Sequence, residues 1–325
     1  MLEGDVVDRQ VPAAYSYSAH HSWGAASVKL LRSLQVLPYT ATNTLQIPML
    51  RVRILQSTSL AVLFSLLFLA GCGGGGEDGG GDVQIVKGER STPIEGASAQ
   101  ITAPADTAVV DSAGVDVTVE ANSFETGVQT ETERAEQIAN STNGQHFHVI
   151  VDNQPYMANY EAGTPFDIET LEPGAHTVVA FPSRSYHESV KGRDAYDLVN
   201  FYVQADSGEF MLSPNEPAII YSRPKGTYSG AGAERIMLDF YLHNVELSQG
   251  NYEARYTITD EQGNEVASTT LTEWAPAFVT GLESGTYEVN LQLIGSDGNV
   301  VPGPFNDTTR EITVKAGNGG NGGEA

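Results

Sequence analysis

Short stretches of alternating apolar and polar residues restrict the fold of this sequence more than any other feature. Val115, Val117 and Val119 alternate with polar residues, and the run Tyr287–Leu293 does the same. A period of two predicts half-buried β-strands. Turn signals recur between such runs, as in Glu172-Pro173-Gly174, Gln262-Gly263-Asn264 and Asp297-Gly298-Asn299. Many short strands separated by turns favour all-β sandwiches, with one short helical insertion at residues 130–140.

Two pairs of segments are similar to each other and indicate a repeated domain. Leu171–Val178 aligns with Leu282–Val289, at an offset of 282 − 171 = 111 residues. Ile150–Gln154 aligns with Ile258–Gln262, at an offset of 258 − 150 = 108 residues. Two copies of one sandwich are the simplest explanation of both offsets.

The Leu-x-x-Gly-x-Tyr pattern that ends at Tyr287 resembles the corner before strand F of fibronectin type III and immunoglobulin-like domains. In those domains the tyrosine hydroxyl donates to upstream backbone. His176 stands at the matching position of the first copy, so we expect it to replace the tyrosine in the core rather than to bind metal. The resemblance implies two tandem immunoglobulin-like β-sandwiches, at residues 98–204 and 213–315. It also implies adhesion, scaffolding or ligand presentation, although a fold alone does not specify a function.

The only cysteine, Cys72, follows a segment typical of exported proteins. Arg51 and Arg53 precede an apolar run, Leu60–Leu69, which has the length of a signal h-region and is shorter than the ~20 residues of a membrane-spanning helix. The sequence Leu-Ala-Gly-Cys at residues 69–72 resembles the lipobox of bacterial lipoproteins, whose cysteine is acylated and becomes the mature N-terminus. A buried structural cysteine is the alternative. Two acyl chains, such as palmitate, would anchor the exported chain stably to the cell envelope, and we expect the outer membrane, facing the periplasm or the surface.

The same resemblance divides the rest of the N-terminal region. Residues 49–71 are predicted to be the signal peptide. Residues 1–48 are then either an artefact of an upstream start site or a long, poorly ordered leader. The glycine-rich stretches predict a flexible tether at residues 72–97 and a disordered tail at residues 316–325.

The charge balance excludes one class of partner. The sequence has 17 basic and 41 acidic residues, a net charge of −24. Cleavage before Cys72 removes five basic and three acidic residues and leaves (17 − 5) − (41 − 3) = −26. Such a field repels nucleic acid, so no nucleic-acid partner is expected.

Catalytic motifs are missing from the sequence. It has no Gly-x-Ser-x-Gly and no His-Glu-x-x-His pattern, and its single cysteine is assigned to the anchor. We therefore expect a chain that is not an enzyme, with an enzyme of unrecognised type as the least favoured alternative.

His146, His148 and His187 are the candidate metal ligands. A His-x-His pattern on a strand places both rings on one face, and His187 lies in the predicted F–G loop at the same end of the sandwich. Neutral imidazole binds zinc and copper well, and a carboxylate could complete the site. The candidates for that carboxylate are Glu131, Glu133 and Glu136. The alternative is a polar strand face on which the histidines only bond to neighbours.

The predicted F–G loop, Ser183–Asp194, supports a second hypothesis. Arg184, Tyr186 and Arg193 place positive charge and an aromatic ring in an acidic chain. Arginine binds anions through two parallel hydrogen bonds and tyrosine stacks on sugar rings, so these residues are candidates for an anionic or saccharide ligand. The alternative is a solvated loop that balances local charge.

Together these observations predict a lipid-anchored binding, adhesive or structural module of the cell envelope. The alternative function is a lipoprotein that binds a metal ion or small ligand through its histidine cluster. The expected partners are the membrane, through the lipid, and a protein, a saccharide or a metal ion. No cofactor is required by the first function, whereas zinc or copper would serve the second.

Overall fold

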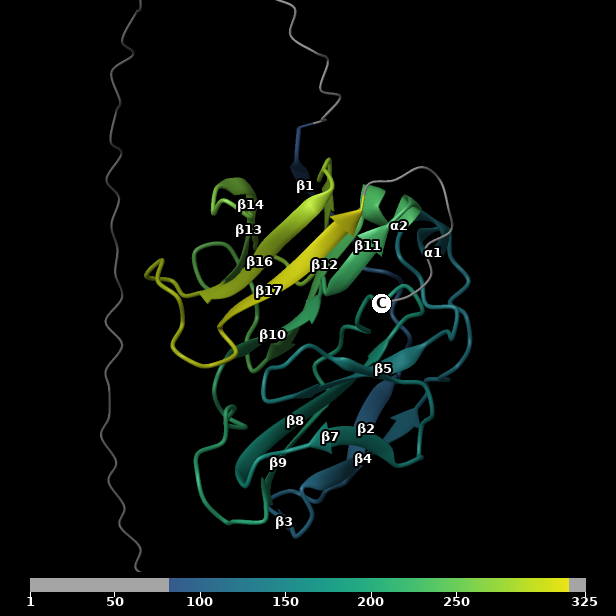
Figure 1. The fold of residues 1–325 in the computed structure, drawn as a ribbon, viewed down its shortest axis with the longest axis vertical. Helices are drawn as coiled ribbons and strands as arrows, with labels where there is room; N and C mark the ends of the chain where they lie inside the picture. Colours follow the sequence, from purple (N-terminus) through teal and green to yellow (C-terminus); the bar gives the residue numbers. More distant parts are fainter. Residues whose placement is uncertain (1–81, 316–325) are drawn as a thin grey trace, which may run out of the picture. The chain divides into compact units, whose positions relative to one another are not determined.

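The computed structural model describes residues 82–315. They form two tandem β-sandwiches and two one-turn helices (Figure 1). The predicted fold class is therefore confirmed. No helix within residues 82–315 is long and apolar enough to cross a membrane. The predictions for residues 1–48, residues 49–71, Cys72 and residues 316–325 lie outside the described residues.

The first sandwich packs a three-stranded sheet against a five-stranded sheet. The smaller sheet has the order β2 (Ser98–Ala103), β4 (Gly114–Asn122), β7 (Phe166–Thr170). The larger has the order β3 (Val109–Val110), β9 (Asp197–Val203), β8 (Gly174–Ser183), β5 (His146–Val151), β6 (Met157–Asn159). The alternating valines of β4 are buried in the core between these sheets, where they join Phe147 and Phe201.

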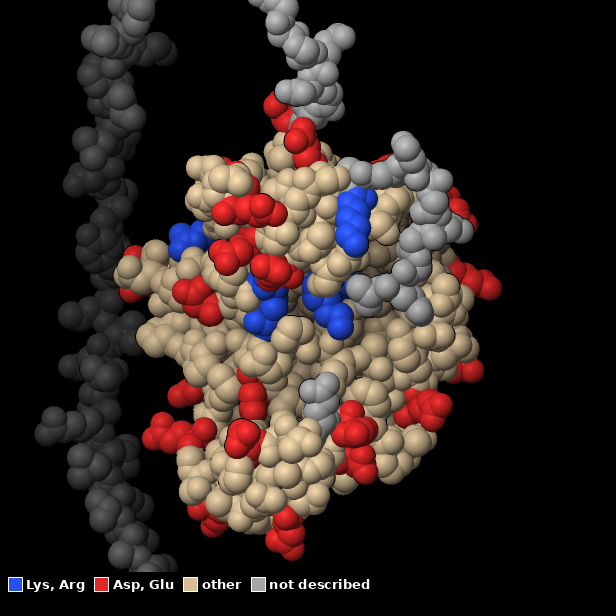
Figure 2. Space-filling view, in the orientation of Figure 1, with Lys and Arg blue, Asp and Glu red and all other residues tan. Residues whose placement is uncertain are grey.

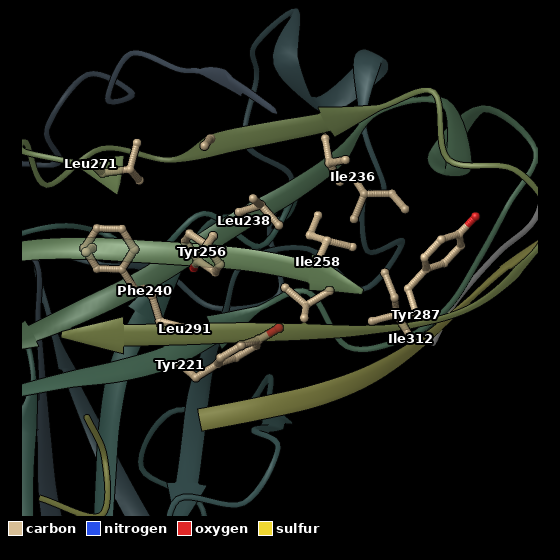
Figure 3. Close-up of a cluster of buried hydrophobic side chains, with 14 of the residues drawn as sticks. Tyr221, Ile236, Leu238, Phe240, Tyr256, Ile258, Leu271, Tyr287, Leu291 and Ile312 are labelled. Atoms are coloured by element: carbon tan, nitrogen blue, oxygen red, sulfur yellow. The ribbon is translucent and has the colours of Figure 1, made fainter. Parts of the chain in front are cut away.

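The second sandwich combines a four-stranded and a five-stranded sheet. The smaller sheet has the order β1 (Gln84–Lys87), β15 (Ala277–Thr280), β12 (Ile236–His243), β10 (Ala218–Arg223). The larger has the order β11 (Gly226–Ser229), β17 (Asp307–Lys315), β16 (Gly285–Ile294), β13 (Glu253–Asp260), β14 (Glu265–Leu271). Leu238 from the smaller sheet meets Tyr256 and Leu291 from the larger one in a shared core (Figure 3).

Both sandwiches have the same arrangement of strands in their larger sheets, which supports the predicted repeat. β3 pairs parallel with β9, and β11 pairs parallel with β17, whereas the other neighbours in these sheets are antiparallel. The corner residues also match. The Tyr287 hydroxyl donates to the Glu283 carbonyl at 3.2 Å, and His176 Nε2 donates to the Glu172 carbonyl at 2.7 Å. His176 thus takes the place of the corner tyrosine, as predicted.

The strand β1 corrects the prediction of a flexible tether over residues 72–97. Gln84–Lys87 pairs antiparallel with β15, with Gln84 opposite Thr280. Ile85 packs against the core of the second sandwich. The segment has only four residues and one half-buried side chain, so its sequence shows no clear alternation of apolar and polar residues. It is a strand because it pairs with the edge of the sheet at β15.

The predicted helical insertion between β4 and β5 is present but shorter than residues 130–140. Only α1 (Arg134–Gln137) is helical there. At both ends of the segment a backbone N–H donates to Ser185 instead of to a helical carbonyl. Thr130 N donates to Ser185 Oγ at 3.1 Å, and Ser141 N donates to the Ser185 carbonyl at 2.8 Å. The second helix, α2 (Ala231–Glu234), lies in the second sandwich.

The second sandwich covers the outer face of β5 and β8. Ile150, Val179 and Phe181 of the first sandwich share one apolar cluster with Ile220 and Tyr241 of the second. Strand β5 is consequently buried on both faces. This contact decides what environment the histidines of β5 experience.

Acidic side chains are spread over the face shown in Figure 2, and basic ones there are few. The view agrees with the strong acidic excess of the sequence.

Candidate metal centre

Strand β5 positions two of the three predicted ligands. The pleat sends Phe147 and Val149 into the core of the first sandwich and leaves His146 and His148 on the opposite face. Both histidines are 0% exposed, because the second sandwich closes over that face. The two histidines therefore point away from the core of the first sandwich, as predicted. The second sandwich buries the face on which they lie.

The three imidazoles converge. His146 Nε2 lies 3.1 Å from His148 Nε2 and 3.2 Å from His187 Nδ1. All three ligand atoms lie within 4.8 Å of one another, and no other such group of His, Cys, Asp or Glu is found in residues 82–315. Tetrahedral zinc, with Zn–N bonds of about 2.0–2.1 Å, holds its ligand atoms about 3.3 Å apart. The separations of His146 Nε2 from the ligand atoms of His148 and His187 are therefore both close to this value.

Hydrogen bonds at the far ring atoms orient two of the ligands. His146 Nδ1 donates to the Gly144 carbonyl at 2.9 Å, so its Nε2 carries the lone pair that faces the cluster. His148 Nδ1 lies 3.0 Å from Ser222 Oγ, and a hydroxyl can bond to either tautomer of the ring. Outer bonds of this kind are typical of metal-binding histidines.

The loop that carries His187 is held in a fixed and uncommon conformation. His187 has φ = 67°, in the left-handed region that few residues other than glycine adopt. His187 N donates to the Arg184 carbonyl at 2.8 Å. The next residue, Glu188, accepts hydrogen bonds from Ser91 N and Oγ at 2.9 and 2.7 Å, and pairs with Arg134 at 2.5 Å. The third ligand is thus pre-positioned by bonds to segments far away in the sequence.

Burial keeps all three histidines in the form that binds metal. It lowers the pKa of His146 from 6.5 to about 4, against the opposing effect of the bond to Gly144. Burial also lowers the pKa of His148 and of His187, and the charges of Arg223 and Lys225 act in the same direction. Neutral imidazole, the metal-binding form, therefore prevails at neutral pH.

Three further residues that were not predicted complete the surroundings. The Tyr156 ring stacks on His148 with a centroid separation of 3.5 Å, and its hydroxyl lies 3.3 Å from His187 Nδ1. Lys225 Nζ lies 4.2 Å from the centre of the Tyr156 ring, and the Arg223 guanidinium lies 5.5 Å from it. Burial raises the pKa of the Tyr156 phenol, which is therefore protonated at neutral pH.

The pairing of β6 with β5 explains why Tyr156 lies beside the histidines. Ala158 of β6 pairs with His148 of β5, and residues paired across strands share a face. Tyr156 and Tyr160 stand two positions on either side of Ala158 and so belong to the same face as the histidines. Arg223 and Lys225 come from the second sandwich, which no local pattern could bring to this place.

The glutamates of the insertion do not complete the site. Glu131, Glu133 and Glu136 are exposed, and none of them belongs to the histidine cluster. The prediction of a carboxylate ligand from this segment is therefore wrong, because only one helical turn forms and it directs its acids to solvent.

The structure also corrects the ligand-binding prediction for the Ser183–Asp194 loop. Arg184 and Tyr186 are 5% and 1% exposed. Arg184 donates to the Thr92 carbonyl, and the Tyr186 hydroxyl bonds to Ser91 Oγ. Arg193 is exposed and pairs with Glu246. These side chains attach the loop to its surroundings and are not free to bind an anion or a saccharide together.

Comparison with known proteins adds no functional information. None of the protein-family models and none of the curated proteins compared matches this sequence. The chain is similar to fibronectin(III)-like modules of Clostridium thermocellum CbhA, at 13% identity over 67% of this chain and 94% of that chain, with a TM-score of 0.23. Similarity to the FN1–FN3 domains of chicken CNTN1 reaches 10% identity over 67% of this chain and 65% of that chain, with a TM-score of 0.22. The BSP domain of a biofilm associated protein shows 14% identity over 67% of this chain and 29% of that chain, with a TM-score of 0.21. Fibronectin type III and related folds are common to binding and structural modules, and these likenesses specify no function.

Proposed function

We propose that this protein is a non-catalytic, lipid-anchored module of the cell envelope that binds a transition-metal ion, zinc or copper, in its first sandwich. His146, His148 and His187 are the ligands. The observation that carries the proposal is the convergence of three buried imidazole nitrogens within 4.8 Å of one another, with two of their separations close to the ligand spacing of tetrahedral zinc.

The donor set favours zinc or copper over other common ions. Imidazole nitrogen suits zinc and copper, whereas magnesium and calcium require oxygen ligands. Within the described residues the cluster contains three histidines and no carboxylate. A buried polar cluster and a non-glycine residue at positive φ both cost stability, and a ligand-binding role explains why they are kept.

Metal binding is expected to stabilise the purified protein. At a free Zn²⁺ or Cu²⁺ concentration one hundred times Kd, the stabilisation is about 2.7 kcal/mol. For a protein of this size that raises Tm by roughly 5–10 °C. Thermal unfolding of chelator-treated protein, followed by circular dichroism during titration with each metal salt, measures the effect.

The comparison variants separate binding at the cluster from binding elsewhere. The double substitution His146→Gln and His148→Gln is expected to abolish the rise in Tm, and His187→Ala to reduce it. His243→Gln removes a buried histidine that bonds to Tyr196 and Ser213, and this variant is expected to keep the rise in Tm. An unchanged Tm in the wild type, or an undiminished rise in the double variant, contradicts the metal-binding proposal.

Lipid attachment is supported by the basic residues, apolar run and Leu-Ala-Gly-Cys sequence at residues 51–72. Cys72→Ser is expected to move the protein from the membrane fraction to the soluble fraction of cells, because acylation supplies the anchor. Fractionation and mass spectrometry of the mature N-terminal peptide check this. An unmodified cysteine in a membrane-bound wild-type protein would argue against the anchor.

A further inference from the structure

The histidine cluster has positively charged neighbours, and three neutral imidazole ligands cannot compensate their charge. Arg223 is 3% exposed, and both Arg223 and Lys225 act electrostatically on all three histidines. A metal dication bound there would face two further positive charges in a buried site. Negative charge must accompany the metal ion and these two cations, because burial of uncompensated charge is costly.

No carboxylate in the described chain belongs to the cluster. The anionic ligand must therefore be another group, and the nearby tyrosines are the candidates. Tyr160 directs its hydroxyl to Ser141 Oγ at 2.7 Å, and Tyr228 accepts from Arg223 Nη1 at 3.0 Å. The hydroxyl of Tyr156 is different, since it lies 3.3 Å from His187 Nδ1, a separation equal to the edge of a tetrahedral site.

Two cations lie beside the Tyr156 ring. Lys225 Nζ lies 4.2 Å from the centre of the ring and donates to the Tyr156 backbone carbonyl at 2.9 Å. The Arg223 guanidinium lies 5.5 Å from the ring centre. Both cations are attracted to the ring face, and the attraction increases when the ring carries negative charge.

We propose that Tyr156 is the fourth ligand of the metal and binds it as a phenolate. The site is then a His₃Tyr centre, in which the phenolate offsets part of the positive charge of the metal ion, Arg223 and Lys225. The inference rests on the proposed metal-binding function and extends it. When the metal–oxygen bond forms, the O–H bond breaks and the proton passes to solvent, with no change of oxidation state.

A phenolate ligand selects among metals. Phenolate is a hard, anionic oxygen donor, and the Irving–Williams order places Cu²⁺ above Zn²⁺ for the same nitrogen and oxygen ligands. The inferred ligand set therefore favours Cu²⁺. Phenolate bound to Cu²⁺ gives a charge-transfer band in visible light, whereas Zn²⁺ has a filled d shell and gives none.

The experiment titrates the full-length protein with CuCl₂ and, separately, with ZnCl₂, and records visible absorption and resonance Raman spectra. Kd values come from competition with a chelator. For the wild type we expect a charge-transfer band with Cu²⁺ that carries phenolate vibrations. We expect Tyr156→Phe to lose the band and to bind Cu²⁺ at least about tenfold more weakly, while it still binds through the histidines.

Tyr160→Phe is the matched control, because the Tyr160 ring lies 4.8 Å from that of His146 while its hydroxyl bonds to Ser141. This variant is expected to keep the band. If the wild type binds Cu²⁺ without a phenolate band, or if Tyr156→Phe keeps the band, the fourth-ligand inference is overturned and the metal-binding function stands. If neither metal binds the wild type, the metal-binding function itself fails.

Discussion

Asp239→Asn is expected to destabilise the protein by about 3–5 kcal/mol, the usual effect of breaking a buried ion pair. Asp239 is 0% exposed in β12, and its carboxylate pairs with Lys191, whose side chain is 3% exposed. The same carboxylate accepts from Ser189 N at 3.0 Å. The asparagine leaves the buried Lys191 charge without its directly paired carboxylate. Urea denaturation measures the loss, which corresponds to a Tm lower by roughly 10 °C.

A second ion pair of the same loop supplies the control for this substitution. The side chains of Arg193 and Glu246 are 77% and 80% exposed, so Glu246→Gln is expected to change stability by less than about 1 kcal/mol. Adding Lys191→Met to Asp239→Asn is expected to restore much of the stability, because the unpaired charge is removed. Equal effects of Asp239→Asn and Glu246→Gln would refute the role of the buried pair.

The pair also explains why the Ser183–Asp194 loop differs from the prediction made from its sequence. Basic residues are mostly exposed, so a loop with several of them is predicted to be a solvated, positively charged surface. Here Lys191 reaches Asp239 of the second sandwich, and Glu188 reaches Ser91 of the segment before β2. Both partners are distant in the sequence, and local composition contains no information about them.

The sequence did predict the positions of the three histidines. Two of them depend on the pleat of one strand, and the third depends on the topology of an immunoglobulin-like sandwich. The orientation of His146 and His148 follows from the pleat of a single strand. The approach of His187 follows from the position of an F–G loop in an immunoglobulin-like sandwich, which the corner at His176 made recognisable. Arg223 could not be predicted, because it reaches the site only through the packing of the second sandwich on the first.

Acid is expected to destabilise the metal-free protein between about pH 6.5 and pH 4. The pKa of His146 is lowered from 6.5 to about 4 in the folded state. In this range the unfolded chain therefore binds a proton at His146 that the folded chain does not bind. The contribution of His146 is fully present above pH 6.5 and is lost as the pH falls towards 4, by about 3 kcal/mol.

His148 and His187 add to the same loss, because burial lowers the pKa of each. Their neighbours Arg223 and Lys225 oppose protonation further and stay positively charged throughout this range. We expect urea midpoints of chelator-treated protein to decrease steadily from pH 7 to pH 4. The double variant His146→Gln and His148→Gln should show a shallower decrease, because two of the buried histidines are gone. Some decrease should remain, because His187 and His243 both have a lowered pKa and still titrate.

The comparison of the two pH profiles distinguishes buried neutral histidines from an acid transition caused by carboxylates. The pKa of Glu188 is lowered from 4.5 in the folded state, mainly by Lys191 and by hydrogen bonds from Ser91, which together overcome the opposing effect of burial. Its contribution to stability is therefore lost only below about pH 4.5. Parallel profiles of the wild type and the double variant above that pH would show that the histidines are accessible to protons in the folded state. Such a result would also weaken the case that the second sandwich closes over a preformed set of metal ligands.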